Sequence, residues 1–171
     1  MVDFPYLQGS MPHCFADMRI TSPEEAKAAV RRRVADGECC LAITLRDTGK
    51  VIGEIEAHPE TGEPHAAENA PRDTFSPCWL LNPAYQGRGY AHEAAHAFLD
   101  WLFRPKGARR IYTYVEENNL PSQRLCERLG MRHEGLFREF VSFVRDSAGN
   151  PVYENTMQYA ILKREWDERH P

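Results

Sequence analysis

The chain has 171 residues, of which 42% are hydrophobic and 27% charged, and its formal net charge at pH 7 is −4. A chain of this size can form one domain with a substantial core. Its acidic balance argues against a general nucleic-acid binder, which usually carries a basic excess.

No stretch approaches the roughly 20 apolar residues of a membrane-spanning helix, and the N-terminal residues lack the pattern of a signal peptide. The five cysteines include no Cys-x-x-Cys pair, which favours a reducing compartment. We therefore expect a cytoplasmic protein, a single domain over residues 1–171, that binds neither nucleic acid nor membrane.

The first clear element is a helix that begins at Ser22-Pro23-Glu24-Glu25. Serine caps a helix, proline suits its first turn, and Glu25 completes a capping box. Before this helix, the segment 14–20 is a candidate short strand, and after it Gly37 is a candidate helix end. Apolar residues then recur at helical spacing: Ala26, Ala29, Val30 and Val34. The run Arg31-Arg32-Arg33 is interpreted as a solvated face of this helix.

The middle of the chain predicts a hairpin, with strands at 41–45 and 51–58 around the turn 46–50. One face of the second strand carries Val51, Gly53, Ile55 and Ala57, and the other carries Ile52, Glu54, Glu56 and His58. Residues 59–73 show no periodicity and form a loop long enough to suspect a functional role.

The second half alternates strands and helices, which predicts a mixed α/β fold. We expect strands at 74–81, 111–115, 135–144 and 152–162, and helices at 88–103 and 120–129. The longer helix has the apolar stripe Ala91, Ala94, Ala95, Phe98, Leu99 and Leu102. In the shorter helix Leu125, Cys126 and Leu129 point inward, and Gly130 ends it. The turn 146–150 joins the last two strands, and Trp166 is assigned to a strand end.

The run Gln86-Gly87-Arg88-Gly89-Tyr90-Ala91 stands between a predicted strand and a predicted helix. The first amides of a helix have no internal partner, and its dipole favours negative charge there. Glycines allow a ligand to approach the backbone closely. The run therefore has the features of a phosphate or pyrophosphate site. By itself the pattern is only moderately specific, because a tight connection is the common alternative.

A second segment, Glu117 to Met131, resembles the "Asn-x-x-Ser, helix, Leu-Gly-Phe/Met" element of the GNAT acyltransferase superfamily. In that family the glycine-rich turn has the form Arg/Gln-x-x-Gly-x-Gly/Ala and binds the pyrophosphate of acetyl-CoA. Gln86, Gly89 and Ala91 match this form. The segment 79–85 is similar to the strand and loop entry of the family, and 158–166 is similar to the ending of its RimJ/RimL-like branch. The resemblance covers about residues 22 to 166, and residues 1–20 match poorly.

The resemblance implies a single α/β domain with a central, mostly antiparallel, twisted sheet flanked by helices. This sheet splays beside the pyrophosphate loop, with acetyl-CoA bound on one side of the cleft and the amine on the other. The implied cofactor-binding residues are Trp79, Leu80, Leu81, Gln86, Gly87, Arg88, Gly89, Tyr90, Ala91, Asn119 and Ser122. RimJ/RimL-like chains usually have a further strand and helix before the Ser-Pro-Glu-Glu helix, whereas about twenty residues precede it here. Acceptor recognition depends on that region.

Two catalytic residues are predicted, Ser122 and Glu54. The resemblance implies that Ser122 donates a proton to the leaving thiolate; helix capping is the alternative for both Asn119 and Ser122. The attacking amine must be neutral, and a carboxylate or histidine normally takes its proton. Glu54 is the first candidate because its strand should lie near the cofactor strand, and His58 is the second. A solvated outer face is the alternative for both. Glu134 and Glu139 remain open as further candidates.

No metal site is expected, because the histidines and acids near residue 60 match no standard zinc spacing. Cys126 is expected in the core rather than as a nucleophile. The predicted function is direct transfer of an acetyl group from acetyl-CoA to a primary amine in a ternary complex. The acceptor is a protein N-terminus or a small amine such as a polyamine or an antibiotic, and a homodimer is possible. The alternative function is a non-catalytic module that binds or senses acyl-CoA.

Overall fold

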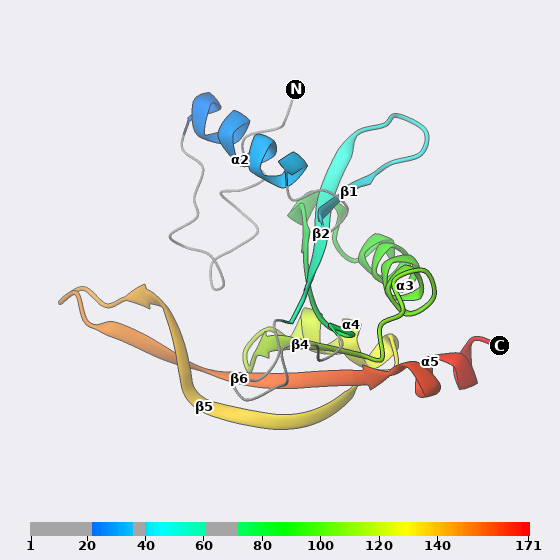
Figure 1. The fold of residues 1–171 in the computed structure, drawn as a ribbon. Helices are drawn as coiled ribbons and strands as arrows, with labels where there is room; N and C mark the ends of the chain where they lie inside the picture. Colours follow the sequence, from blue (N-terminus) through cyan, green and yellow to red (C-terminus); the bar gives the residue numbers. More distant parts are fainter. Residues whose placement is uncertain (1–21, 36–39, 61–71) are drawn as a thin grey trace.

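A computed structural model describes residues 22–35, 40–60 and 72–171, so the segment 14–20, Gly37 and most of the loop 59–73 lie outside the described residues. Six strands form one sheet in the order β1-β2-β3-β4-β6-β5 (Figure 1). All pairs are antiparallel except β3 with β4. The strands are β1 (Cys40–Thr44), β2 (Val51–Pro59), β3 (Thr74–Leu81), β4 (Arg110–Glu116), β5 (Arg132–Arg145) and β6 (Pro151–Leu162). The helices are α2 (Pro23–Ala35), the short 3-10 helix η3 (Pro83–Tyr85), α3 (Tyr90–Phe103), α4 (Leu120–Arg128) and α5 (Lys163–Arg169). The predicted mixed α/β fold is confirmed.

The core lies between one face of the sheet and the helices α3, α4 and α5. Four residues of the predicted stripe of α3 are buried, Ala95, Phe98, Leu99 and Leu102, while Ala91 and Ala94 in its first turns are half-buried. The inward face of α4 is also confirmed, and Gly130 ends that helix with a φ of 80°. The apolar spacing of 3 and 4 residues was therefore a sufficient guide to these buried faces.

The stripe predicted for α2 is narrower than expected. The serine cap is present, since the Oγ of Ser22 accepts the N–H of Glu25 at 3.2 Å. Ala26 and Ala29 are buried, but Val30 and Val34 are 45% and 75% exposed. The small alanines face the rest of the chain, and the valines continue the helical spacing onto the solvent side. Arg31 and Arg32 are exposed as predicted.

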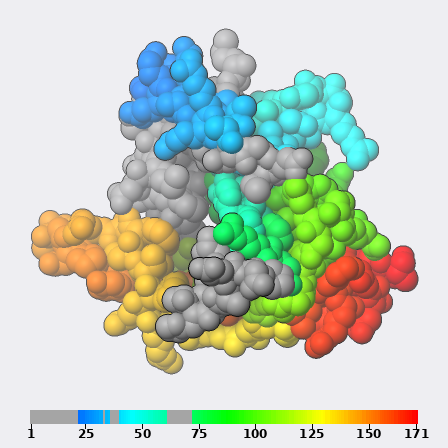
Figure 2. Space-filling view, viewed as in Figure 1, coloured from blue at the N-terminus to red at the C-terminus, as the bar shows by residue number. Residues whose placement is uncertain are grey.

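The assignment of Trp166 to a strand end is wrong, because Trp166 lies in helix α5. The helix begins where a carboxylate oxygen of Glu165 accepts the N–H of Leu162 at 2.8 Å. Trp166 is fully buried, and its indole N–H donates to Asp100 of α3 at 3.1 Å. Figure 2 shows the red C-terminal segment seated beside the green one. A tryptophan after a long strand suggests a strand by propensity, but tertiary packing on α3 decides its structure.

The strands β3 and β4 separate soon after they begin. Their parallel pairing comprises only Thr74 with Arg110 and Phe75 with Ile111, whereas β4 pairs with β6 over its whole length. Pro77 follows at once in β3, and proline has no N–H to donate to a neighbouring strand. A side-chain bond also links the two strands there, in which the buried Oγ1 of Thr113 donates to the carbonyl of Pro77 at 3.0 Å. The predicted splay of the sheet is present here.

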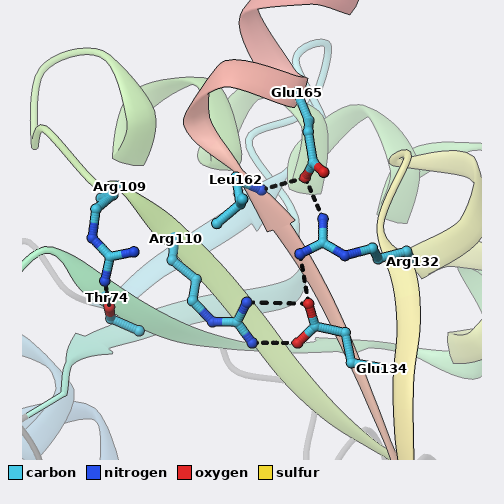
Figure 3. A network of polar contacts seen from close by, with 7 residues as sticks. All are labelled: Thr74, Arg109, Arg110, Arg132, Glu134, Leu162 and Glu165. Carbon is cyan, nitrogen blue, oxygen red and sulfur yellow. Dashed lines mark hydrogen bonds and ion pairs between the residues drawn. The ribbon is translucent and has the colours of Figure 1, made fainter.

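A network of charged side chains joins the strands at the end where β3 and β4 are still paired (Figure 3). Glu134 of β5 accepts hydrogen bonds from Arg110 of β4 and from Arg132, which also pairs with Glu165 of α5. Beside it, Arg109 bonds Asp73 and Thr74 at the start of β3. Because several charges share these contacts, the network is worth more than an isolated surface pair. It holds the closed end of the splay.

The β5–β6 hairpin extends away from the other strands (Figure 1). Its register shifts between Phe137 and Val141, which marks a bulge. Glu139 in this bulge has a φ of 49°, which non-glycine residues seldom adopt. Asn155 holds the bulge, because its Oδ1 accepts the N–H of Glu139 at 2.9 Å and its Nδ2 donates to Glu117 at 2.8 Å. One side chain therefore connects the bulge to the loop between β4 and α4.

Across residues 22–35, 40–60 and 72–171, the helices are all too short or too polar to cross a membrane.

Substitution of Gly53 in β2 tests how closely β3 packs against β2. A Cβ added there would lie 2.4 Å from the carbonyl oxygen of Leu80, which is backbone and cannot swing away. We expect Gly53→Ala to lower the free energy of unfolding by about 1–3 kcal/mol through overpacking, measured by urea denaturation. Gly135→Ala is the control, because nothing lies within 4 Å of its added Cβ. Equal midpoints for the two variants would contradict the close approach.

Candidate functional site

The separation of β3 and β4 opens a cleft of about 910 Å³. Its walls come from β3, the glycine-rich loop with the start of α3, β4, and α4. Nearly all the residues predicted to bind the cofactor line it: Trp79, Leu80, Leu81, Gln86, Gly87, Gly89, Tyr90, Ala91, Asn119 and Ser122. Arg88 is the exception, because its guanidinium lies over the ring of Tyr85, 5.9 Å from the centroid. The two motifs found in the sequence therefore meet at one cleft.

The glycine-rich loop presents backbone amides to this cleft. Gly87 and Gly89 have φ angles of 72° and 88°, in the left-handed region that favours glycine. Within the described part of the chain, the amides of residues 87–92 have no hydrogen-bond acceptor, and the first helical bond runs from Glu93 to Gly89. The side chain of Gln86 fixes the loop by donating to the carbonyl of Leu81 at 3.1 Å. The loop is thus preformed for an anion, with the helix dipole in support.

The edge of β3 supplies a second set of backbone groups. Beyond Phe75, no described strand pairs with β3 on its cleft side, while β2 pairs with it on the other side as far as Leu81. Amide and carbonyl groups on such an edge form strand-like hydrogen bonds with an extended ligand. This edge leads directly to the anion loop.

Helix α4 begins in the opposite wall of the cleft. The Oδ1 of Asn119 accepts the N–H of Ser122 at 3.3 Å, so Asn119 caps the helix. Ser122 is half-buried and lines the cleft, and its hydroxyl has no hydrogen-bond partner among the described residues. The capping alternative is therefore observed for Asn119 alone.

Comparison with known proteins agrees with this geometry. The family model for the Acetyltransferase (GNAT) domain matches residues 8–132. The chain belongs to the GNAT acetyltransferase family. It is 33% identical over 148 residues to the uncharacterized N-acetyltransferase YnaD of Bacillus subtilis, covering 86% of this chain and 78% of the relative. It is 28% identical over 92 residues to spermidine N(1)-acetyltransferase of Escherichia coli, covering 53% and 46% of the two chains.

A solved GNAT structure shares the fold over most of both chains. The acetyltransferase from Bacillus anthracis superposes with a TM-score of 0.76 at 27% identity, covering 95% of this chain and 88% of that one. Together with the family match, this shows that the protein is a GNAT N-acetyltransferase with acetyl-CoA as its cosubstrate. The unpartnered loop amides and the open strand edge are the groups that fit such a donor.

The carboxylates proposed as bases from sequence do not line this GNAT cleft. Glu54 and His58 share one face of β2, as predicted, but their register partners on β3 lie between them and the cleft. Glu134 is held in the charged network, where hydrogen bonds from Arg110 lower its pKa. Glu139 belongs to the bulge of β5. The assignment of the base to Glu54 stays a prediction.

The cleft is also lined by residues that the sequence analysis did not single out: His92, Tyr114, Glu116, Arg124, Arg128 and Phe143. Arg124 and Arg128 could have been predicted from the sequence, because basic residues four apart share one face of a helix, and this helix begins at the Asn119–Ser122 motif. Glu116 and Phe143 carry none, because their positions depend on how β4 and β5 bend around the splay. Tyr114 also joins Phe137 and Phe140 in an aromatic group whose ring centroids lie 5.0–5.8 Å apart.

Two further ionisable groups are excluded from base or nucleophile roles by their surroundings. Burial raises the pKa of Tyr112, and the hydrogen bond that its hydroxyl donates to Glu60 adds to this effect. Tyr112 is therefore protonated at neutral pH. Cys126 packs in the core, as predicted, and this burial raises the pKa of its thiol to about 12. The thiol therefore stays protonated at neutral pH and is a poor nucleophile. The described residues include no group of three His, Cys, Asp or Glu side chains placed to hold a metal ion.

Gly89 tests the anion loop, with Gly149 of the β5–β6 turn as a matched control. Their φ angles are 88° and 87°, and neither added Cβ would meet an atom within 4 Å. Alanine at either position carries roughly 1–2 kcal/mol of backbone strain. Only Gly89→Ala places a methyl group at the anion loop, so we expect it to weaken CoA binding about tenfold or more, measured by calorimetry. Equal CoA affinity in the two variants would contradict the loop assignment.

Proposed function

We propose that this enzyme transfers the acetyl group of acetyl-CoA to a primary amine by direct attack within a ternary complex. The observation that carries the proposal is the cleft between β3 and β4, which has preformed backbone donors on one wall and polar side chains on the other. Such a cleft can hold two substrates with their reacting atoms in contact, without an acyl-enzyme.

The donor is held mainly by backbone in this proposal. The amides of residues 87–91 bind the pyrophosphate, and the edge of β3 from Trp79 to Leu81 bonds the pantetheine arm. Arg124 and Arg128 of α4 line the same cleft and add positive charge for the phosphates. Backbone recognition of this kind selects CoA as a class and is indifferent to the acceptor.

Ser122 is the proposed general acid. Its hydroxyl lines the cleft and is not used by the cap of α4, which Asn119 provides. When the C–S bond breaks, the sulfur of CoA becomes a thiolate, and a nearby hydroxyl can give it a proton. The hydroxyl recovers that proton from the nitrogen that has just formed the amide bond.

The amine is proposed to enter from the side of β4 opposite the helices. The aromatic group of Tyr114, Phe137 and Phe140 lies there with 37–50% of each residue exposed, and it offers apolar contact beside the reacting nitrogen. A protein N-terminus and a small amine such as a polyamine both satisfy this arrangement. The relative that acts on spermidine supports the small amine, and the lower pKa of an α-amine supports the N-terminus.

A panel of amines tests the proposal. Polyamines, aminoglycoside-type amines and N-terminal peptides are each incubated with acetyl-CoA, and thiol release is recorded. We expect turnover with one class, with saturation in both substrates and no release of CoA when the amine is omitted. Tight CoA binding without turnover for any amine would instead favour the sensing module.

Ser122→Ala tests the acid. We expect turnover to fall by roughly 100-fold, with the affinity for acetyl-CoA within about twofold of the unsubstituted protein, because the backbone holds the donor. Ser147→Ala is the control, since Ser147 lies in the exposed turn of the β5–β6 hairpin. Unchanged turnover in Ser122→Ala would remove Ser122 as the acid.

Membership of the RimJ/RimL-like branch, a cytoplasmic location, the absence of a nucleic-acid partner and a homodimer remain predictions. For the homodimer, the β5–β6 hairpin offers exposed apolar side chains in Phe140, Val152 and Tyr153. Light scattering of the purified protein measures the oligomeric state directly.

A further inference from the structure

Glu116 is the one carboxylate among the described residues that line the cleft. It is the last residue of β4 and lies on the same side of that strand as Tyr114, opposite to the core residue Val115. Its backbone carbonyl accepts the N–H of Asn119 at 2.9 Å, so its position relative to the cap of α4 is set by the backbone. Glu116 and Ser122 therefore belong to one rigid corner of the cleft.

The side chain of Glu116 is in an unusual state. The residue is only 8% exposed, and within the described part of the chain its carboxylate has neither a cation nor a hydrogen-bond donor. A buried charge without a partner is costly, and proteins normally pair it. By contrast, Glu134 and Glu165 follow that rule, because both bond arginines in the charged network.

Thr156 of β6 provides an independent observation at the same place. It is the register partner of Glu116 in the antiparallel β4–β6 pair, and partners in such a pair have Cβ atoms roughly 4.5–5.5 Å apart on one face. Thr156 is 3% exposed, and its buried Oγ1 has no hydrogen-bond partner among the described residues. A buried hydroxyl without a partner, next to a carboxylate that lines the cleft without one, indicates the position of a polar guest or a bound water.

We infer that Glu116 takes the proton from the acceptor ammonium, directly or through one water held with Thr156. This role rests on the proposed acetyl transfer. An ammonium next to a carboxylate with little solvent around it is strongly attracted, which orients the amine. Glu116 is thereby a catalytic residue that the sequence did not reveal, and Thr156 is a positioning residue.

The protons balance with this assignment. The ammonium has three N–H bonds and the amide product has one, so two protons leave the nitrogen. Glu116 receives the first before the nitrogen attacks the thioester carbonyl. As the C–N bond is complete and the C–S bond breaks, the second proton passes to the CoA sulfur through the hydroxyl of Ser122. Glu116 then releases its proton to solvent.

The cleft contains other titratable groups, and the experiment must separate them from Glu116. Those lining the cleft are Cys78, Tyr90, His92, Tyr114, Arg124 and Arg128. On the neighbouring elements, Glu117 bonds Asn155, and Glu154 precedes that residue in β6. Substitution of Glu116 leaves all of them in place.

The test compares Glu116→Gln, Glu116→Asp, Glu54→Gln and Glu168→Gln, with kcat/KM measured from pH 6 to 10 for an amine of known pKa. We expect Glu116→Gln to lower kcat/KM by about 100-fold or more at pH 7 and to retain the acetyl-CoA affinity. The loss should shrink as the pH nears the pKa of the free amine, because solvent then removes the proton. Glu116→Asp should restore part of the activity, and Glu168→Gln, an exposed carboxylate of helix α5 outside the cleft, is the control and should stay within about threefold of the unsubstituted enzyme. Thr156→Val should lower kcat more than it raises KM.

Several results would overturn this role. A Glu116→Gln enzyme within about threefold of the unsubstituted one, or an equal loss at every pH, would contradict proton acceptance by Glu116. A large, pH-dependent loss in Glu54→Gln alone would return the role to Glu54. Absence of turnover by the unsubstituted protein with every amine would contradict the proposed function itself, and with it this role.

Discussion

The separation of β3 from β4 is the constraint on which the rest of the structure depends. Two register pairs join these strands before Pro77, and the hydroxyl of Thr113 adds a hydrogen bond to the carbonyl of Pro77. If the parallel pairing continued further, the backbone N–H and C=O groups of β3 and β4 would hydrogen-bond each other and leave no room for a ligand between the strands. Because the ladder stops, no described strand pairs with the cleft edge of β3 beyond Phe75, and α4 begins across from this edge. The amides of the glycine-rich loop open into the space between them.

An opening of this kind must be held at its closed end. The charged network does this by joining β4, β5 and α5 through Arg110, Glu134 and Arg132 (Figure 3). At the other end, Asn155 connects the bulge of β5 to the loop before α4. The bulge carries a backbone conformation that costs about 1 kcal/mol or more, and Asn155 holds it in place. Both sets of contacts fix β4 and the start of α4 relative to β5 and α5.

The charges of the site are divided according to their partners. The pKa of Glu134 is lowered mainly by hydrogen bonds from Arg110, and that of Glu165 mainly by the N–H of Leu162 and then by Arg132, so both carboxylates have structural roles. Glu116 has no such partner among the described residues and faces the cleft, so it is available for a proton. The groups proposed to bind the cosubstrate are mainly backbone dipoles, whose charge does not change with pH. Donor binding and proton transfer can therefore vary independently, which suits a family that uses one cosubstrate with many amines.

The sequence by itself determined most of the helices and strands, the glycine-rich turn and the cap of α4, because each depends on neighbours within a few residues. The Gln86–Ala91 and Asn119–Ser122 motifs were therefore recognisable from their residues alone. The predictions for Trp166 and for Val30 and Val34 in the apolar stripe of α2 were wrong, since packing between distant segments overrides local propensity there. Only the tertiary structure revealed that Glu116 and Thr156 are buried side by side. Their contact depends on the register of β4 with β6 and on the angle at which β3 separates from β4. Neither can be predicted from a local sequence pattern.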